Sequence, residues 1–195
     1  MSQRIVLGVF VLLAGLLGQG HATQAQGVEQ LMVLPPKGWK VGYHEQRGTV
    51  EVTEIIPPDQ TIEAWQDMLV VELIAGKPDK DVQTVLRERL EEIHRDCENV
   101  GAGEPQLSKE NGYDTGVRAI ACPRSQKWNK GEVSLFKVLL GNDRTYVVSR
   151  SWRSEPFEKQ HVSLPSDKME EWLTFMTQVT VCDPRDPAHP CPVRK

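Results

Sequence analysis

The sequence has 195 residues, with 23 Lys and Arg against 27 Asp and Glu, and a formal net charge of −4 at pH 7. This length suits one ordinary hydrophobic core and is short for two, so we expect a single domain. Because the charges are spread along the chain without a basic cluster, the composition argues against nucleic-acid binding, which depends on counterion release at a basic surface.

Residues 1–25 have the pattern of a secretory signal peptide. Arg4 precedes an apolar run over residues 5–17, which is too short to cross a bilayer, and small residues follow at Gly20, Ala22 and Ala25. Cleavage after Ala22 or after Ala25 fits this pattern, and a retained signal anchor is the alternative. We therefore expect an exported protein, periplasmic or secreted, with no stable membrane span once the signal is removed.

The first element expected in the mature chain is a β-hairpin. Two segments, residues 40–46 and 49–56, flank Arg47-Gly48, and Val50 and Val52 alternate with polar neighbours in the second segment. Alternation with a period of two is typical of a strand with one buried face, and a short turn containing glycine joins such strands.

A short helix and a buried strand are expected next. Pro57-Pro58 ends the second strand of the hairpin. Residues 61–66 could form one or two helical turns, with Asp59 or Thr61 as the cap. Residues 68–74 are apolar at nearly every position and rich in β-branched side chains, which predicts a strand covered on both faces.

The clearest helix is predicted over residues 79–99, between Pro78-Asp79 and the glycines Gly101 and Gly103. Its apolar positions recur at three- and four-residue steps, and they are Val82, Leu86, Leu90, Ile93 and Cys97. Such a stripe must lie on the sheet, so the thiol of Cys97 should point inward toward a strand.

Four strands in series predict an antiparallel meander. They cover residues 106–109, 113–122, 131–140 and 145–152. Asn111-Gly112 joins the first two, and this dipeptide is the strongest short hairpin signal.

A second helix is predicted after residue 165, capped by Ser166 or Asp167. The side chains expected on its buried face are Met169, Trp172, Leu173, Met176 and Val179. The tail that follows is proline-rich and without periodicity, so we expect a stapled loop or a frayed end.

Four cysteines, an even number in a chain predicted to reach an oxidising compartment, favour disulfides. Of the three pairings that four cysteines allow, we favour Cys97–Cys122, which joins a helix end to a strand, and Cys182–Cys191, which closes a short loop. A zinc site in the tail, using His189 and nearby acids with the two cysteines, is the alternative. It lacks the paired spacing of structural zinc sites.

The order of elements predicts an α+β fold, in which a long helix and a C-terminal helix pack on an antiparallel β-sheet that is stapled by disulfides. We expect a signal peptide at residues 1–25, a single α+β domain at residues 26–180 and a proline-rich tail at residues 181–195 closed by a disulfide.

This order, together with Trp65-Gln66-Asp67-Met68 leading into a buried strand, resembles the fold shared by photosystem extrinsic PsbP-type proteins and Mog1-type proteins, here expected in an exported bacterial protein. The resemblance covers residues 31–180. It implies a binding or assembly factor more than an enzyme, and it carries over no catalytic residue.

Motifs of common enzyme classes are missing from the sequence. There is no G-x-S-x-G around a serine, no glycine-rich phosphate loop and no H-E-x-x-H. The histidines of the mature chain, His44, His94, His161 and His189, are isolated, and oxidised cysteines cannot act as nucleophiles. We therefore expect no catalytic residue, no metal and no cofactor.

One loop offers a candidate binding residue. Trp128 lies in a polar segment beside Lys127 and Lys130, where an exposed ring could contact a protein partner or an anionic ligand. The alternative, which the sequence favours, is a tryptophan folded back over the sheet as a packed lid.

Three functions fit these observations, in order of preference. The first is a non-catalytic module, present as a monomer, that binds an envelope protein or stabilises an envelope assembly. The second is a small-ligand carrier with a pocket between the sheet and the long helix. The third is a hydrolase whose residues are scattered in sequence but meet in space.

We predict that the mature protein begins at Thr23 or Gln26, because these residues follow the two small-residue cleavage sites. N-terminal sequencing of protein purified from the cell envelope measures this directly. Recovery of a mature pool that still begins at Met1 would contradict the prediction.

Overall fold

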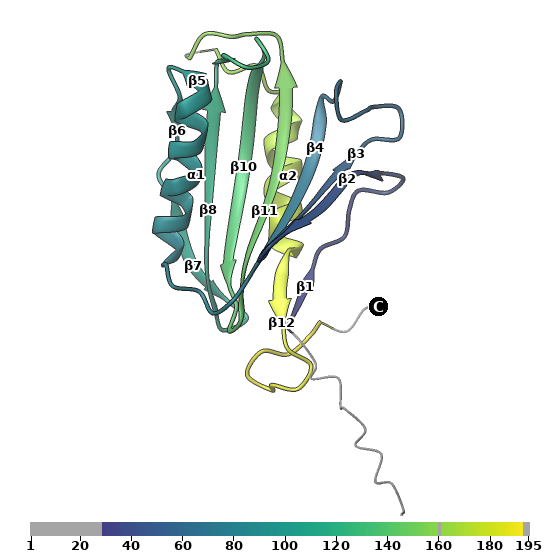
Figure 1. Ribbon diagram of the computed structural model, residues 1–195, viewed down its shortest axis with the longest axis vertical. Coiled ribbons are helices and arrows are strands. Elements are labelled where there is room, and N and C mark those ends of the chain that lie inside the picture. The colour runs from purple at the N-terminus through teal and green to yellow at the C-terminus, as the bar shows by residue number, and fades with distance from the viewer. Residues whose placement is uncertain (1–28, 160, 193–195) are drawn as a thin grey trace, which may run out of the picture.

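The computed structural model describes residues 29–159 and 161–192 (Figure 1), so the predicted signal peptide lies outside the described residues. The main sheet contains β2 (Lys40–Arg47), β3 (Val50–Ile56), β4 (Asp67–Ala75), β6 (Gly101–Ala102), β7 (Gln106–Glu110), β8 (Tyr113–Cys122), β10 (Gly131–Leu140) and β11 (Arg144–Ser154). Two small pairs are formed by β1 (Gln30–Met32) with β12 (Thr180–Cys182), and by β5 (Cys97–Glu98) with β9 (Arg124–Ser125). The helices are α1 (Val82–Asp96) and α2 (Ser166–Gln178).

The strand order of the main sheet is β2-β3-β4-β11-β10-β8-β6, with β7 also paired to β8. All its pairings are antiparallel, which confirms both the predicted hairpin and the predicted meander. The turn between β7 and β8 holds Asn111 and Gly112 at φ values of 48° and 84°, the left-handed region that this dipeptide favours.

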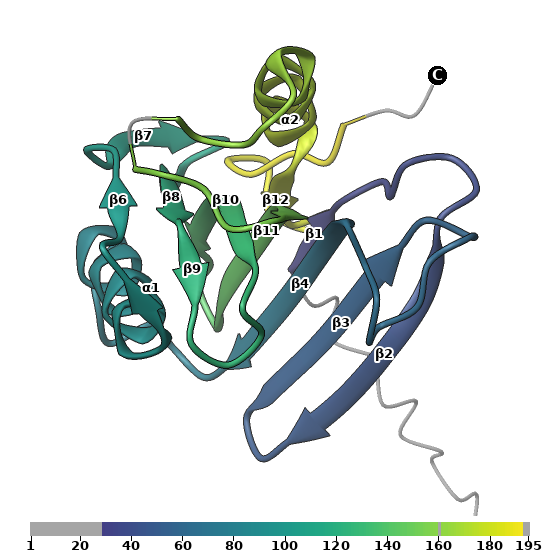
Figure 2. The same ribbon diagram turned by 90° about the horizontal axis from the view of Figure 1, so that it is seen from above.

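The two helices pack on opposite faces of the sheet (Figure 2), which confirms the α+β fold. Leu86 of α1 packs with Val138 and Val147, whereas Trp172 of α2 packs with Leu139 and Tyr146. Neighbouring residues of β10 and β11 thus serve different cores, because successive side chains of a strand point to opposite faces. α1 lies over β8 and β10, and β4, β3 and β2 continue beyond it (Figure 2).

A buried lysine attaches the end of α2 to the sheet. Lys137 of β10 is 1% exposed, and its Nζ donates to the carbonyl oxygens of Met176 (2.8 Å) and Val179 (2.9 Å) and to the carboxylate of Glu110 (2.6 Å). Carbonyls at a helix C-terminus lack partners within the helix and carry its partial negative charge. All three donors of the ammonium group are therefore used, and α2 is fixed to β10.

A buried arginine fastens the other end of α2. Arg150 of β11 is 0% exposed and donates from Nη2 to Asp67 of β4 and to Glu171 of α2, at 3.1 Å in each case. Lys168 of α2 donates to the second oxygen of Asp67 at 2.9 Å. The guanidinium also lies 4.8 Å from the ring centre of Trp39, a favourable cation–π distance.

Both predicted disulfides are present. Cys97 and Cys122 join the residue after α1 to the last residue of β8, with their Cα atoms 5.7 Å apart. Cys97 is buried, as the apolar stripe predicted, although it lies just beyond the helix in an extended conformation. α1 is shorter than predicted because Asp81, and not Asp79, caps it by accepting the backbone N–H of Thr84 at 2.7 Å.

The second disulfide, Cys182–Cys191, closes a loop that packs against the turn between β7 and β8. The Nδ2 of Asn111 donates to the carbonyl oxygens of Val181 (2.8 Å) and Pro190 (3.1 Å), and the ring of His189 lies 4.3 Å from that of Tyr113. The two cysteines of the alternative zinc site are thus bonded to each other, and the tail is a stapled loop. The pairing of β12 with β1 was not predicted.

The helical turns predicted over residues 61–66 are wrong. This segment forms non-helical turns, in which Gln60 accepts the backbone N–H groups of Gln66 (2.6 Å) and Asp67 (3.2 Å) through its side-chain oxygen. These amides are satisfied by a side chain, so no helix is needed to satisfy them. The segment instead lies over β2, where a Cβ on Gly42 would come within 2.6 Å of Ile62.

Two details predicted for α2 are also wrong. Its N-cap is Pro165 and no side chain caps it, because Ser166 and Asp167 already belong to the first turn. Leu173 is 49% exposed, because the buried face of the helix is formed by Trp172 and Met176 and Leu173 lies outside that face. In the part of the chain that the structure describes, no helix is both long enough and apolar enough to span a membrane.

We expect Lys137→Met to lower the free energy of unfolding by about 3 to 5 kcal/mol, because it leaves two buried carbonyls and a carboxylate without their donor. Lys109→Met is the control, since the exposed pair of Lys109 with Asp114 should contribute about 1 kcal/mol at most. Urea titrations of both variants measure the difference. Equal losses would show that Lys137 does not hold α2.

Candidate binding groove

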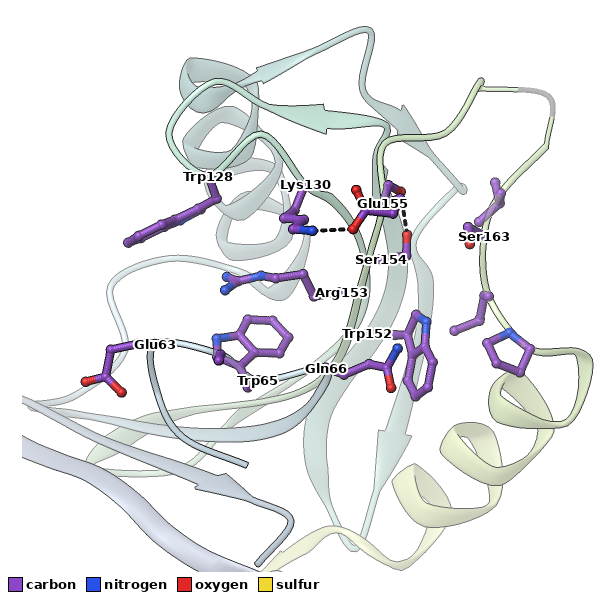
Figure 3. A pocket seen from close by; sticks show the side chains of 14 residues that line it. Glu63, Trp65, Gln66, Trp128, Lys130, Trp152, Arg153, Ser154, Glu155 and Ser163 are labelled. Carbon is purple, nitrogen blue, oxygen red and sulfur yellow. Dashed lines mark hydrogen bonds and ion pairs between the residues drawn. The ribbon is translucent and has the colours of Figure 1, made fainter. Parts of the chain in front are cut away.

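A groove opens on the α1 face of the sheet, where the helix leaves β11, β4 and β3 uncovered, and it extends past the end of β11 to the segment that leads into α2. It consists of three cavities that all include Trp128 in their walls, and we call it the tryptophan groove. The outer chamber, of about 740 Å³, lies between Trp65, Trp128, Trp152 and residues 162–165 (Figure 3). The inner chamber, of about 400 Å³, lies between the sheet and α1, and the side chamber, of about 260 Å³, lies beside the Cys97–Cys122 disulfide.

The floor of the groove follows from the alternation of β11. Ser149, Ser151 and Arg153 point into the inner chamber, whereas Arg150 on the same strand points toward α2. The Oγ atoms of Ser151 and Ser134 are 2.7 Å apart, so these buried hydroxyls satisfy each other. A polar floor is therefore built into a face that elsewhere holds the apolar contacts of α1.

Arg153 occupies the centre of the groove. Its guanidinium lies 3.7 Å from the ring centre of Trp65 and 5.6 Å from that of Trp128, and Figure 3 shows it between the two rings. Nη2 donates to Glu132 over a long 3.4 Å, while Nε is buried with no hydrogen-bond partner among the described residues. The backbone N–H of Arg153 donates to the carbonyl of Gln66 at 2.8 Å, which holds Trp65 against β11.

Two carboxyl groups share Arg153 in the inner chamber. Burial raises the pKa of both Glu54 and Glu132 above the ordinary value, and the nearby guanidinium of Arg153 opposes this shift in each. The negative charge of Glu54 raises the pKa of Glu132 further. One arginine thus faces two partly desolvated acids, and carboxyl groups outnumber the arginines in the lining of the inner chamber.

The loop that carries Trp128 is a tight turn anchored to α1. Ser125 and Lys130 are joined by a 2.8 Å backbone hydrogen bond, and the N–H of Gln126 donates to the carbonyl of Asp96 at 2.7 Å. Within this turn the Trp128 side chain is 54% exposed, so the packed-lid interpretation is wrong. Its ring still forms one wall of each chamber, and the Nζ of Lys127 lies 4.6 Å from the ring centre.

The structure places all three predicted contact residues near the mouth of the groove. Lys130 lines the outer chamber, where it pairs with Glu155, and Lys127 covers one side of Trp128. Sequence reasoning missed Trp65 and Arg153 as partners of Trp128. The alternation of Ser149 and Ser151 in the strand predicted over residues 145–152, continued by Arg153 just after it, was the available signal for a polar sheet face.

The histidines lie apart from the groove and from one another. His44 is on β2 beside Thr53, His94 is exposed on α1, His161 is exposed in a loop, and His189 bonds Asp186 at 2.8 Å in the tail. None of them lines the three chambers. Within residues 29–159 and 161–192 there is no group of three side chains placed to hold a metal ion.

A scan against protein-family models gives no match, and a search of curated proteins gives none either. Among solved structures, the chain is similar to the Saccharomyces cerevisiae Ran-binding protein Mog1p, with 14% identity and a TM-score of 0.49. It is also similar to a single-site mutant of the protein Mog1, with 13% identity and a TM-score of 0.48. Each match covers 77% of this chain and 92% of the other.

We expect Trp65→Ala to lower the free energy of unfolding by about 3 kcal/mol or more, because Trp65 is only 9% exposed and supports both Ile56 and Arg153. Trp128→Ala should change it by about 1 kcal/mol or less, since much of this ring already faces solvent. Urea titrations of the two variants test the comparison. A loss for Trp128→Ala as large as that for Trp65→Ala would mean that Trp128 is a core residue.

Proposed function

We propose that this chain is an exported, non-catalytic module that binds another protein through the tryptophan groove. The observation that carries the proposal is the half-exposed Trp128 at the meeting point of three open chambers. Tryptophan and arginine side chains contribute most to binding at many protein interfaces, particularly where they line a pocket. Trp128, Trp65 and Arg153 supply both residue types in one place.

Export is supported by two independent features. The N-terminal sequence has the order of a signal peptide, and the described residues contain two disulfides. Disulfides persist mainly in oxidising compartments. Both features support a location in the periplasm or outside the cell.

A non-catalytic role is supported by the chemistry of the groove lining. Its hydroxyl groups include Ser134 and Ser151, which bond each other, and no imidazole lies among the lining residues to activate them. The cysteines at the side chamber form a disulfide and have no free thiol. The groove offers rings, charges and hydroxyls for binding.

The second candidate is a small-ligand carrier, and the position of the inner chamber favours it. This cavity of about 400 Å³ lies between the sheet and α1. Small-molecule sites commonly have volumes of about 300 to 1,000 Å³. A thermal shift in the presence of envelope metabolites would support this candidate, because a bound ligand stabilises the folded state.

The test of the main proposal is capture of the binding partner by matched variants. We expect Trp128→Ala to reduce recovery of the partner from the cell envelope by about tenfold or more, because interface tryptophans often contribute over 2 kcal/mol. Leu173→Ala is the control, since Leu173 is an equally exposed apolar residue on the opposite face.

Recovery is measured by mass spectrometry per folded molecule, with thermal melts run in parallel. Unchanged recovery with Trp128→Ala, at an unchanged melting temperature, would overturn the proposal. Equal loss with both variants would show that the capture does not involve the groove.

A further inference from the structure

We infer that the tryptophan groove receives a positively charged segment of the partner protein, rich in lysine or arginine. This inference deepens the proposed function and rests on it. It specifies the charge of the partner segment that binds in the groove, which the shape of the groove alone does not define.

The lining of the three chambers carries an excess of negative charge. Its acidic residues are Glu54, Glu63, Glu72, Glu92, Asp96, Glu132 and Glu155. Its basic residues are Arg89, Lys130 and Arg153. The protein as a whole is only mildly acidic, so this excess is concentrated in the groove.

Each basic residue of the lining already has an acidic partner within the protein. Arg89 pairs with Glu72 and, at 2.9 Å, with Glu92, while Lys130 pairs with Glu155. Arg153 pairs with Glu132 at 3.4 Å. An anionic partner would therefore compete with internal carboxylates for these three side chains, whereas a cationic partner would not.

Three acids of the lining have no partner at hydrogen-bond or ion-pair distance, although the charge of Arg153 acts on one of them, Glu54. The side chains of Glu54, Glu63 and Asp96 make no hydrogen bond or ion pair with any residue that the structure describes. They are also distributed along the groove, with Glu63 in the outer chamber, Glu54 in the inner chamber and Asp96 in the side chamber. Such a row suits an extended segment with several positive charges better than a single ion.

The tryptophans provide the second element of recognition. Arg153 over Trp65 and Lys127 over Trp128 show that these rings already accept cationic groups within the protein. Because Trp128 is half exposed, part of its ring is open to a guanidinium or ammonium group of the partner. Stacking on Trp128 with a nearby carboxylate favours arginine and lysine over neutral side chains.

The test uses a fluorescent hexa-arginine peptide as the probe. A fluorescent hexaglutamate peptide is the negatively charged control. The groove variant is Glu54→Gln with Glu63→Gln and Asp96→Asn, which removes three charges without breaking an ion pair. The control variant is Glu104→Gln with Asp143→Asn and Glu170→Gln, which removes the same charge at exposed positions outside the groove.

We expect fluorescence anisotropy to show that the groove variant binds hexa-arginine about tenfold more weakly, while the control variant stays within about twofold of the original protein. Binding should also weaken as the pH is lowered, because burial raises the pKa of Glu54 and of Glu132 and both then take up protons. The charged groups that face them are Glu72 and Arg153 on the sheet, and Arg89, Glu92 and Asp96 on α1. Added salt should weaken it as well.

Equal weakening by both variants would overturn the inference, because it would reflect only the net charge. Binding of hexaglutamate in place of hexa-arginine would overturn it too. If Trp128→Ala abolishes partner capture while the groove variant captures the partner normally, the proposed function stands and this inference fails. If neither variant affects capture, the proposed function itself fails.

Discussion

The buried pair of Arg150 and Asp67 is the interaction on which most of the molecule depends. A fully desolvated guanidinium is strongly destabilising without a partner. Asp67, Glu171 and the ring of Trp39 together compensate this charge, and they belong to β4, α2 and the segment before β2. The pair therefore joins β11 and β4, at the centre of the sheet, to α2.

The same pair sets the position of the groove. Trp65 lies two residues before Asp67, and Arg153 lies three residues after Arg150 on the opposite face of β11. The Arg150–Asp67 pair, on the α2 side of the sheet, thus fixes the distance between the ring of Trp65 and the guanidinium of Arg153. These two groups meet on the α1 side. With Lys137 holding the far end of α2, residues 162–165 that lead into this helix are held as a wall of the outer chamber.

Most of the fold could be predicted from the sequence because its signals are local. The alternation in β3, the Asn-Gly turn and the apolar stripe of α1 each depend on residues within one element. The disulfides followed from the cysteine count and from the position of Cys97. Residues 61–66 were mispredicted because the side chain of Gln60, and not a helical hydrogen bond, satisfies the amides of Gln66 and Asp67.

The groove could not be predicted because the only local signal, the alternation in β11, indicates a polar sheet face and not a cavity. Trp65, Trp128 and Arg153 come from three distant segments, and they meet only because α1 covers β8 and β10 and leaves β11 open. The exposure of Trp128 depends on backbone hydrogen bonds within its turn and to the end of α1. Residue types alone predict neither how many strands a helix covers nor the direction in which a turn projects from the sheet.

The Cys97–Cys122 bond also ties the rim of the groove to the sheet. It forms part of the side chamber and lies at the base of the β5–β9 ribbon, from which the Trp128 turn projects. A chain in which this bond is reduced lacks the covalent tie between the end of α1 and the end of β8. Oxidation of the two thiols therefore restricts the motion of the Trp128 turn, so the redox state of the surroundings sets how well the rim of the groove is ordered.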